Sequence, residues 1–336
     1  MAENKYTVQD FKSAAQVRWC PGCGDFSVLA SVQKAMSELN YNKEDYAVIS
    51  GIGCSSRFPY YMNTYGFHGI HGRAGVLASG VKVANPKLSV WQITGDGDAL
   101  AIGGNHFIHE IRRNIDLNVI LFNNEIYGLT KGQYSPTSKF GQVTNSSPFG
   151  TIEKPFNAGC LTLGARGNFF ARTIDVYVKE TVEIFKEADK HKGTSIIEVL
   201  QNCVIFNNGA HKQITDREER DNNQLWLEHG KPMIFGKEKN KGLVLDGLKL
   251  KVVTIGENGI SEKDILVHDM YEEDLTLHSM LVNLNLPDFP VVFGIIRAVK
   301  ADTYNDLLYK QIEDVQAKSP IKGMDDVFNS GSTWEV

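Results

Sequence analysis

The sequence predicts an α/β protein in which a mostly parallel sheet carries helices on both faces. Two observations support this prediction. Short apolar runs that end at Gly, Asn or Cys alternate with longer segments of helical periodicity, and this alternation is typical of βαβ units. The chain also has 336 residues, of which 42% are hydrophobic, enough to bury a large core. In such sheets, ligands bind at the carboxyl ends of the strands.

Four apolar runs have the length of buried parallel strands. They span residues 46–52, 88–94, 117–122 and 195–200. The segments before and between them have helical patterns, at about 25–38, 73–84, 101–114 and 176–191.

The chain changes character after residue 206. Residues 207–241 are charged and only weakly periodic, which indicates a boundary or a surface excursion. Residues 242–258 then predict a hairpin, and an acidic stretch leads to the apolar run 289–299. We therefore expect one α/β domain over 1–206 and a C-terminal extension over 207–336.

Composition and charge argue against several classes of protein. The formal net charge of −5 gives no basic surface for nucleic acid or anionic membrane. No apolar run approaches the roughly 18 residues that span a bilayer, and the first residues carry charges where a signal peptide is apolar. The odd number of cysteines, five, does not suit a disulfide framework. We expect a cytoplasmic protein that binds neither nucleic acid nor membrane.

The most informative segment runs from residue 88 to residue 130. A strand ends at the sequence GDGD (95–98), a helix follows, and the next strand ends at NN (123–124). A right-handed βαβ unit places both strand ends at one edge of the sheet, so Asp96 and Asn124 can face one point. The glycines let a phosphate approach the backbone, but the carboxylate would repel a diphosphate unless a cation such as Mg²⁺ lies between them.

Two other interpretations of this segment remain open. The dinucleotide fingerprint G-x-G-x-x-G fits Gly95 and Gly97, but its third glycine position is Leu100, and Asp96 is unsuited to a pyrophosphate bound without metal. The segment could also be a Gly- and Asp-rich turn without a ligand.

Several motifs in this sequence resemble those of a known family. GDG followed about 30 residues later by NN resembles the thiamine diphosphate signature. Other stretches are similar to the beta subunit of 2-oxoacid:ferredoxin oxidoreductases, specifically its 2-oxoglutarate branch: NNEIYGLTKGQ (123–133), IGCSSRFPYY (52–61), FHGIHGRAGVLASGVKVANP (67–86) and LPDFPVVFGIIRAV (286–299). The resemblance covers most of residues 15–210. It implies a thiamine diphosphate-binding fold of the pyrophosphate-binding type for residues 1–206.

The same resemblance implies a set of cofactor residues. Asp96, Asn124 and the backbone carbonyl of Ile126 correspond to the family's Mg²⁺ ligands. The remaining positions that match its thiamine-binding loops are Ile52, Gly53, Cys54, Ser55, Gly95, Gly97, Asp98, Gly128, Leu129 and Thr130.

The C-x-x-C of Cys20 and Cys23 is ambiguous when the residues are taken alone. An iron–sulfur ligand pair, a zinc site, a redox pair and plain buried thiols all remain open, although no second C-x-x-C favours zinc. The family resemblance favours the iron–sulfur ligand pair, and implies one 4Fe–4S cluster bound by Cys20, Cys23, Cys54 and Cys203. Cys160 is left over and is expected to be a buried thiol.

Two further side chains are candidates for catalysis. His71 lies in the sequence HGR and is expected beside the cofactor or substrate, or in a structural role. Arg57 follows Ser55-Ser56, and its guanidinium could pair with the distal carboxylate of 2-oxoglutarate, or form a surface salt bridge instead.

The activity that the resemblance implies is oxidative decarboxylation of 2-oxoglutarate to succinyl-CoA and CO₂, or the reverse carboxylation, with electrons passing through the cluster to ferredoxin. Pyruvate or another 2-oxoacid is the alternative substrate, and an iron–sulfur electron-transfer subunit without thiamine chemistry is the alternative of another class. A thiamine enzyme also needs a pyrimidine-binding domain with a glutamate. The remaining sequence shows no second such domain, so we expect an alpha subunit to supply it.

Overall fold

The computed structural model describes residues 6–332 and 334, and its largest element is an eight-stranded sheet. In the order in which they lie side by side, the strands are β2 (Tyr65–His68), β1 (Tyr46–Ser50), β3 (Ser89–Gly95), β4 (Asn118–Asn123), β6 (Ser195–Leu200), β5 (Phe169–Ile174), β11 (Val291–Ala298) and β7 (Gln224–Trp226). All neighbouring strands are parallel except β11 and β5. The predicted mostly parallel sheet is confirmed.

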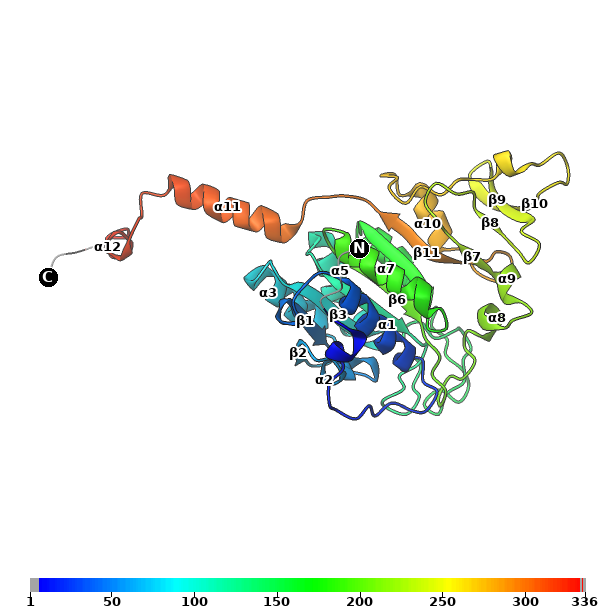
Figure 1. Cartoon of the computed structure of the whole chain (residues 1–336), viewed down its shortest axis with the longest axis horizontal. Coiled ribbons are helices and arrows are strands. Elements are labelled where there is room, and N and C mark those ends of the chain that lie inside the picture. The colour runs from blue at the N-terminus through cyan, green and yellow to red at the C-terminus, as the bar shows by residue number, and fades with distance from the viewer. Residues whose placement is uncertain (1–5, 333, 335–336) are drawn as a thin grey trace.

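Helices cover both faces of this sheet (Figure 1). Alternate residues of one strand point to opposite faces, so Tyr46 and Val48 of β1 pack with one group of helices, while Ala47 and Ile49 pack with the other. The first group is α1 (Asp25–Glu38) and α7 (Val178–Lys190), and the second is α3 (Ala74–Ala84), α5 (Gly104–Arg113) and α6 (Ala158–Gly164).

The helix expected over residues 101–114 is present as α5 (Gly104–Arg113), but it starts three residues later than predicted. A short helix, α4 (Asp96–Leu100), directly follows β3, and α5 begins only at Gly104. A methyl group added at Gly103 would lie 2.4 Å from the backbone oxygen of Asp98. The chain therefore turns tightly between the two helices, and this turn keeps the GDGD residues at the carboxyl edge of the sheet.

The C-terminal third is not a separate layer. It contributes a small antiparallel sheet of β8 (Ile234–Phe235), β9 (Lys241–Asp246) and β10 (Lys249–Thr254), and the last two form the hairpin expected over 242–258. However, β7 and β11 also lie after residue 206 and belong to the main sheet. The expected boundary after residue 206 therefore does not separate two sheets.

The remaining α-helices are α2 (Phe58–Tyr61), α8 (Lys212–Thr215), α9 (Arg220–Asn223), α10 (Thr276–Val282), α11 (Tyr304–Lys318) and α12 (Met324–Phe328). Figure 1 shows α11 and α12 projecting away from the rest of the molecule. The base of this arm is fastened where the Tyr309 hydroxyl donates to the backbone oxygen of Val83 (3.0 Å). Among the described residues, the helices are too short or too polar to cross a membrane.

Candidate active site

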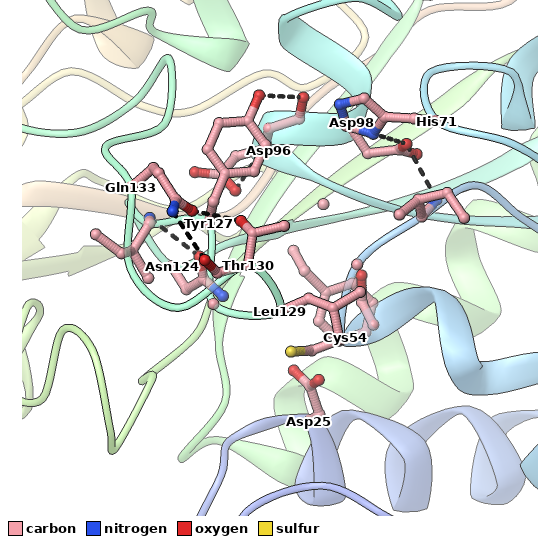
Figure 2. A pocket seen from close by; sticks show the side chains of 18 residues that line it. Asp25, Cys54, His71, Asp96, Asp98, Asn124, Tyr127, Leu129, Thr130 and Gln133 are labelled. Carbon is pink, nitrogen blue, oxygen red and sulfur yellow. Dashed lines mark hydrogen bonds and ion pairs between the residues drawn. The ribbon is translucent and has the colours of Figure 1, made fainter. Parts of the chain in front are cut away.

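A cavity of about 430 Å³ opens at the carboxyl ends of β1, β3 and β4 (Figure 2). Its wall contains all fourteen residues predicted to lie beside the cofactor, and four that the sequence did not suggest. The fourteen are Ile52, Gly53, Cys54, Ser55, His71, Gly95, Asp96, Gly97, Asp98, Asn124, Ile126, Gly128, Leu129 and Thr130, and the other four are Asp25, Phe122, Tyr127 and Gln133.

Asp96 lies at the first turn of α4 and is almost fully buried. Its Oδ2 accepts hydrogen bonds from the hydroxyls of Ser135 (2.6 Å) and Thr137 (2.5 Å), and its Oδ1 accepts one from the backbone N–H of Gly97 (2.9 Å). Burial raises the pKa of Asp96, and these hydrogen bonds oppose that shift. A divalent cation at this carboxylate would offset the cost of burying its charge.

Asp98 plays a different part from Asp96. Its Oδ1 accepts hydrogen bonds from the backbone N–H groups of Ile52 (3.1 Å) and Gly72 (2.7 Å) and contacts His71 Nδ1 (3.0 Å), while its Oδ2 accepts one from Thr94 (2.7 Å). Both carboxylate oxygens are thereby occupied by protein donors. Asp98 therefore holds two cavity loops together and turns the His71 ring toward the cavity edge.

The two asparagines after β4 point to different sides. Asn124 lies on the cavity wall, where its Nδ2 donates to Gln201 (2.9 Å) and its Oδ1 accepts from the backbone N–H of Ile126 (3.2 Å). Asn123 turns away and donates to Glu198 (2.8 Å). The structure thus brings Asp96, Asn124 and Ile126 to one cavity, although their role as metal ligands stays a prediction.

Tyr127 explains why position 97 is glycine. The Tyr127 hydroxyl donates to the backbone oxygen of Gly97 (2.9 Å), and a methyl group added at Gly97 would lie 2.1 Å from the Tyr127 ring. The loop after β4 therefore lies directly against the backbone of the GDGD turn.

Cys54 and Cys203 lie close together beside the cavity. A methyl group added at Gly128 would be 3.6 Å from the Sγ atoms of both cysteines. Burial, and then the charge of Asp25, raises the pKa of Cys54 to about 12, and Cys203 and Cys20 contribute. Burial also raises the pKa of the Cys23 thiol, to which Asp25, Cys54 and Cys203 add.

Cys54 is therefore within electrostatic reach of the other three predicted cluster cysteines. In the described part of the chain, no three His, Cys, Asp or Glu side chains form a group that could hold a single metal ion. Cys160 lies elsewhere, on α6, where it is half-buried and donates to Asn283 Oδ1 (3.1 Å).

Asp25 was missed in the sequence because nothing in its spacing distinguishes it from an ordinary first-turn helix residue. It is buried, its Oδ2 has no hydrogen-bond partner, and its carboxyl group points toward Cys54 across the cavity (Figure 2). Burial, with the neighbouring Asp175, raises the pKa of Asp25 to about 7.

Arg57 is not part of the cavity wall. Its Nε donates to the hydroxyl of Tyr61, four residues further on (3.1 Å). Among the predicted site residues, Arg57, Cys20, Cys23 and Cys203 thus border the cavity region without lining it.

Comparison with known proteins agrees with this geometry. Residues 51–199 match the family described as thiamine pyrophosphate enzyme, C-terminal TPP binding domain. The chain is 42% identical over 331 residues to 2-oxoglutarate oxidoreductase subunit KorB of Mycobacterium tuberculosis, covering 98% of this chain and 88% of that protein. The chain belongs to the 2-oxoacid:ferredoxin oxidoreductase beta subunits.

Two further comparisons extend this assignment. A beta subunit of 2-oxoacid:ferredoxin oxidoreductase 1 of Aeropyrum pernix is 45% identical over 200 residues, which is 60% of this chain and 63% of that protein. A solved 2-oxoglutarate:ferredoxin oxidoreductase from Magnetococcus marinus, with 2-oxoglutarate, coenzyme A and succinyl-CoA bound, has a TM-score of 0.78 and 30% identity, covering 98% of this chain and 97% of that one.

In this beta subunit, the thiamine family match includes Cys54 but not the other three predicted cluster ligands, Cys20, Cys23 and Cys203. The match therefore covers the thiamine-binding fold and one of the four predicted cluster cysteines.

Proposed function

We propose that this chain is the beta subunit of a 2-oxoglutarate:ferredoxin oxidoreductase that binds thiamine diphosphate, Mg²⁺ and one 4Fe–4S cluster. With an alpha subunit, it would convert 2-oxoglutarate, coenzyme A and two oxidised ferredoxins into succinyl-CoA, CO₂, a proton and two reduced ferredoxins, or run the reverse carboxylation. The cytoplasmic location expected from the sequence belongs to the same proposal.

One observation carries the proposal: a single cavity is bordered both by oxygen ligands that suit Mg²⁺ and by thiols that suit an iron–sulfur cluster. Mg²⁺ binds carboxylate, amide and carbonyl oxygens together with substrate phosphates, and Asp96, Asn124 and Ile126 line one cavity. Gly95 leaves the backbone before Asp96 open, since a methyl group there would lie 3.7 Å from Ser55 Oγ, and this leaves room for a diphosphate. The space over Gly97 is instead filled by the Tyr127 ring.

The cysteines fit a cluster in their chemistry. Four thiolates are the usual ligands of a 4Fe–4S cluster, and Cys54 and Cys203 both border Gly128 of the cavity wall. Burial raises the pKa of the Cys23 and Cys54 thiols, and binding to iron would remove their protons. A cluster here would lie within electron-transfer range of the thiamine cavity.

When bound, thiamine diphosphate supplies the nucleophilic carbon that attacks the 2-oxoacid and retains the electrons after CO₂ leaves. The residues of this chain would bind the cofactor and orient the groups beside it. Asp98 fixes the loops of Ile52 and Gly72 and orients His71 toward the cavity. His71, which is only partly buried, then stands as a hydrogen-bonding group at the cavity edge.

Arg57 remains our candidate for the distal carboxylate of 2-oxoglutarate. It belongs to the short helical turn Ser55–Arg57 that follows Cys54, and its charge reaches Cys54. Because the cavity wall does not include Arg57, this pairing requires either movement of the guanidinium or a substrate that extends beyond the cavity.

The alpha subunit is needed because the cavity offers no glutamate for the aminopyrimidine ring. Among the described lining residues, the acidic ones are Asp25, Asp96 and Asp98. Asp96 and Asp98 are held by hydrogen bonds at the diphosphate end, so we propose that the partner supplies the glutamate.

The test is anaerobic co-expression of this chain with its alpha subunit, followed by an assay of ferredoxin or viologen reduction. We expect reduction that requires coenzyme A and proceeds faster with 2-oxoglutarate than with pyruvate. A preference for pyruvate would reassign the substrate. A brown, thiamine-loaded complex that reduces no dye with any 2-oxoacid would refute the proposed activity.

A further inference from the structure

We propose that Ser135 and Thr137 are positioning residues that hold the Asp96 carboxylate in the orientation that binds the divalent cation. The inference rests on the proposed function, since it assumes that Asp96 is a metal ligand. It assigns a role to two hydroxyls that lie outside the GDG and NN motifs, eleven and thirteen residues beyond Asn124.

Both hydroxyls act on the same carboxylate oxygen. Ser135 Oγ donates to Asp96 Oδ2 at 2.6 Å, and Thr137 Oγ1 donates to the same atom at 2.5 Å. All three side chains are at least 95% buried, with exposed fractions of 2%, 4% and 3%. Two fixed donors on one oxygen prevent the carboxylate from rotating about its Cβ–Cγ bond.

This arrangement leaves the other oxygen available. Asp96 Oδ1 accepts one hydrogen bond, from the neighbouring Gly97 N–H, and a carboxylate oxygen has capacity for a further partner. The two hydroxyls thus give the carboxylate oxygens different roles: Oδ2 is fixed by the protein, and Oδ1 is left for a cation. Outer hydrogen bonds to a ligating carboxylate commonly tune metal affinity in this way.

The hydroxyls are themselves fixed before any ligand binds. The Ser135 N–H donates to Ser138 Oγ (2.8 Å), and Ser138 Oγ donates to the backbone oxygen of Glu125 (2.6 Å). The Phe156 N–H donates to the backbone oxygen of Pro136 (2.8 Å). Because Glu125 lies between Asn124 and Ile126, the segment that offers two of the proposed metal ligands is linked through Ser138 to the turn that carries both hydroxyls.

Thr137 has a second oxygen neighbour, so its single hydroxyl proton can be donated to only one of two acceptors. Its Oγ1 also lies 2.9 Å from Asn123 Oδ1, and the Asn123 amide is turned by its donation to Glu198 (2.8 Å). Glu198 in turn accepts from Arg172 (2.7 Å). The charged and closer acceptor is Asp96, so the hydroxyl proton belongs there, and the contact with Asn123 Oδ1 then lacks a proton between the two oxygens.

A structural role alone makes a different prediction. If the hydroxyls only satisfied a buried acceptor, removing one would lower the melting temperature without changing cation affinity. If they position Asp96, cation affinity falls even when the fold is retained. Binding of the cation, measured apart from turnover, therefore separates the two roles.

The experiment uses the complex of this chain with its alpha subunit, freed of divalent metal and supplied with saturating thiamine diphosphate. Free Mn²⁺ is measured by its aqueous EPR signal as Mn²⁺ is added. We expect Thr137→Val to weaken Mn²⁺ binding by about 10-fold and Thr137→Ser to stay within about 2-fold of wild type, because serine retains the donor.

Thr144→Val is the matched control, since it makes the same substitution in the same loop at a hydroxyl that contacts Ser146 and Ser147 rather than Asp96. Its Mn²⁺ affinity should equal that of wild type. Ser135→Ala combined with Thr137→Val should weaken binding more than either alone, because Oδ2 then has no hydroxyl donor.

Wild-type Mn²⁺ affinity in Thr137→Val, or an equal loss in Thr137→Ser, would overturn the inference. Asp96→Asn serves to distinguish this failure from failure of the proposed function. Loss of Mn²⁺ binding in Asp96→Asn with none in Thr137→Val would refute only the positioning role, whereas unchanged binding in Asp96→Asn would show that the metal site itself is misplaced.

Discussion

Asp96 and Asp98 are two residues apart, but their partners give them different functions. Asp98 has protein donors on both oxygens and ties together loops from separate parts of the chain. Asp96 has one oxygen held by two hydroxyls and the other with a single backbone donor. At the level of single residues, the hydrogen-bond partners of a carboxylate, rather than its position in a motif, indicate which one can accept a metal.

The same reasoning distinguishes the cysteines. Cys203→Ser should lose or degrade the cluster, because its Sγ lies beside Gly128 together with that of Cys54. The anaerobically purified complex should lose its brown colour, and its iron content should fall well below the about four atoms per chain of an intact 4Fe–4S cluster.

Cys160→Ser is the control for that measurement. Its thiol lies on α6 and donates to Asn283, so iron content and absorption should match those of the wild type. If Cys160→Ser loses the cluster and Cys203→Ser retains it, the assignment of the fourth ligand is incorrect.

The residues of the cavity were predictable to the extent that they lie in sequence motifs. The GDGD turn, NN and the segment 52–55 follow strands, and parallel topology alone brings strand ends to one edge. Ser135, Thr137 and Asp25 could not be found in this way. Ser135 and Thr137 reach Asp96 through a long loop, and Asp25 reaches the cavity through the packing of α1. A local sequence pattern does not record either of these.

Among the helices, α5 contains an unusual buried acid. Glu110 is 2% exposed, its Oε1 accepts from Gln92 of β3 (3.2 Å), and its Oε2 has no hydrogen-bond partner. A methyl group added at Gly75 of α3 would lie 2.1 Å from that Oε2. Burial raises the pKa of Glu110 to about 8, so the packing of α3, α5 and β3 encloses a neutral acid.

This acid should make the stability of the fold depend on pH. A carboxyl group with a raised pKa in the folded state stabilises the fold fully below its unfolded value, and this contribution is lost as the pH rises through the folded value. Wild-type protein should therefore lose up to about 3 kcal/mol of stability between pH 5 and pH 8. Glu110→Gln, which keeps the shape and cannot ionise, should lose less.

Thermal melts of both proteins at pH 5 and pH 8 measure this difference. The stability of Glu110→Gln relative to wild type should rise from the lower to the higher pH. Parallel pH dependences in the two proteins would show that ionisation of Glu110 does not lower the stability of the fold.

The elements that the sequence did not reveal have specific physical reasons. Strand β5 reads FFARTI, and its central Arg172 is unusual for a strand with both faces covered, but it is buried because it pairs with Glu198 of the neighbouring strand (2.7 Å). Strand β2 is short and mostly exposed at the sheet edge. Both strands form because of pairing with residues distant in sequence. Neither has the continuous apolar run from which the strands at 46–52, 88–94, 117–122 and 195–200 were predicted.

At the scale of the whole molecule, the sheet is completed by the part of the chain that appeared to be an extension. β11 pairs with β5, and its Val292, Phe293 and Ile296 are fully buried. A chain that ends at residue 206 would leave the β5 edge and this core surface open. We therefore expect the 1–206 fragment to be insoluble or to lack a cooperative melt by circular dichroism.

A chain that ends at Lys318 provides the control. It removes α12 but keeps β11 and α11, and should remain soluble with a cooperative transition. A soluble and cooperatively folding 1–206 fragment would instead support the two-unit organisation expected from the sequence.

The antiparallel strand β11 also determines when this protein can finish folding. Strand β5 ends at Ile174 and its partner β11 ends at Ala298, 124 residues later. At a synthesis rate of about 5–20 residues per second, the edge of β5 waits roughly 6–25 s for its partner to be made. During that time, the nascent chain presents an unpaired hydrophobic strand edge, so the main sheet cannot be completed until β11 has been made.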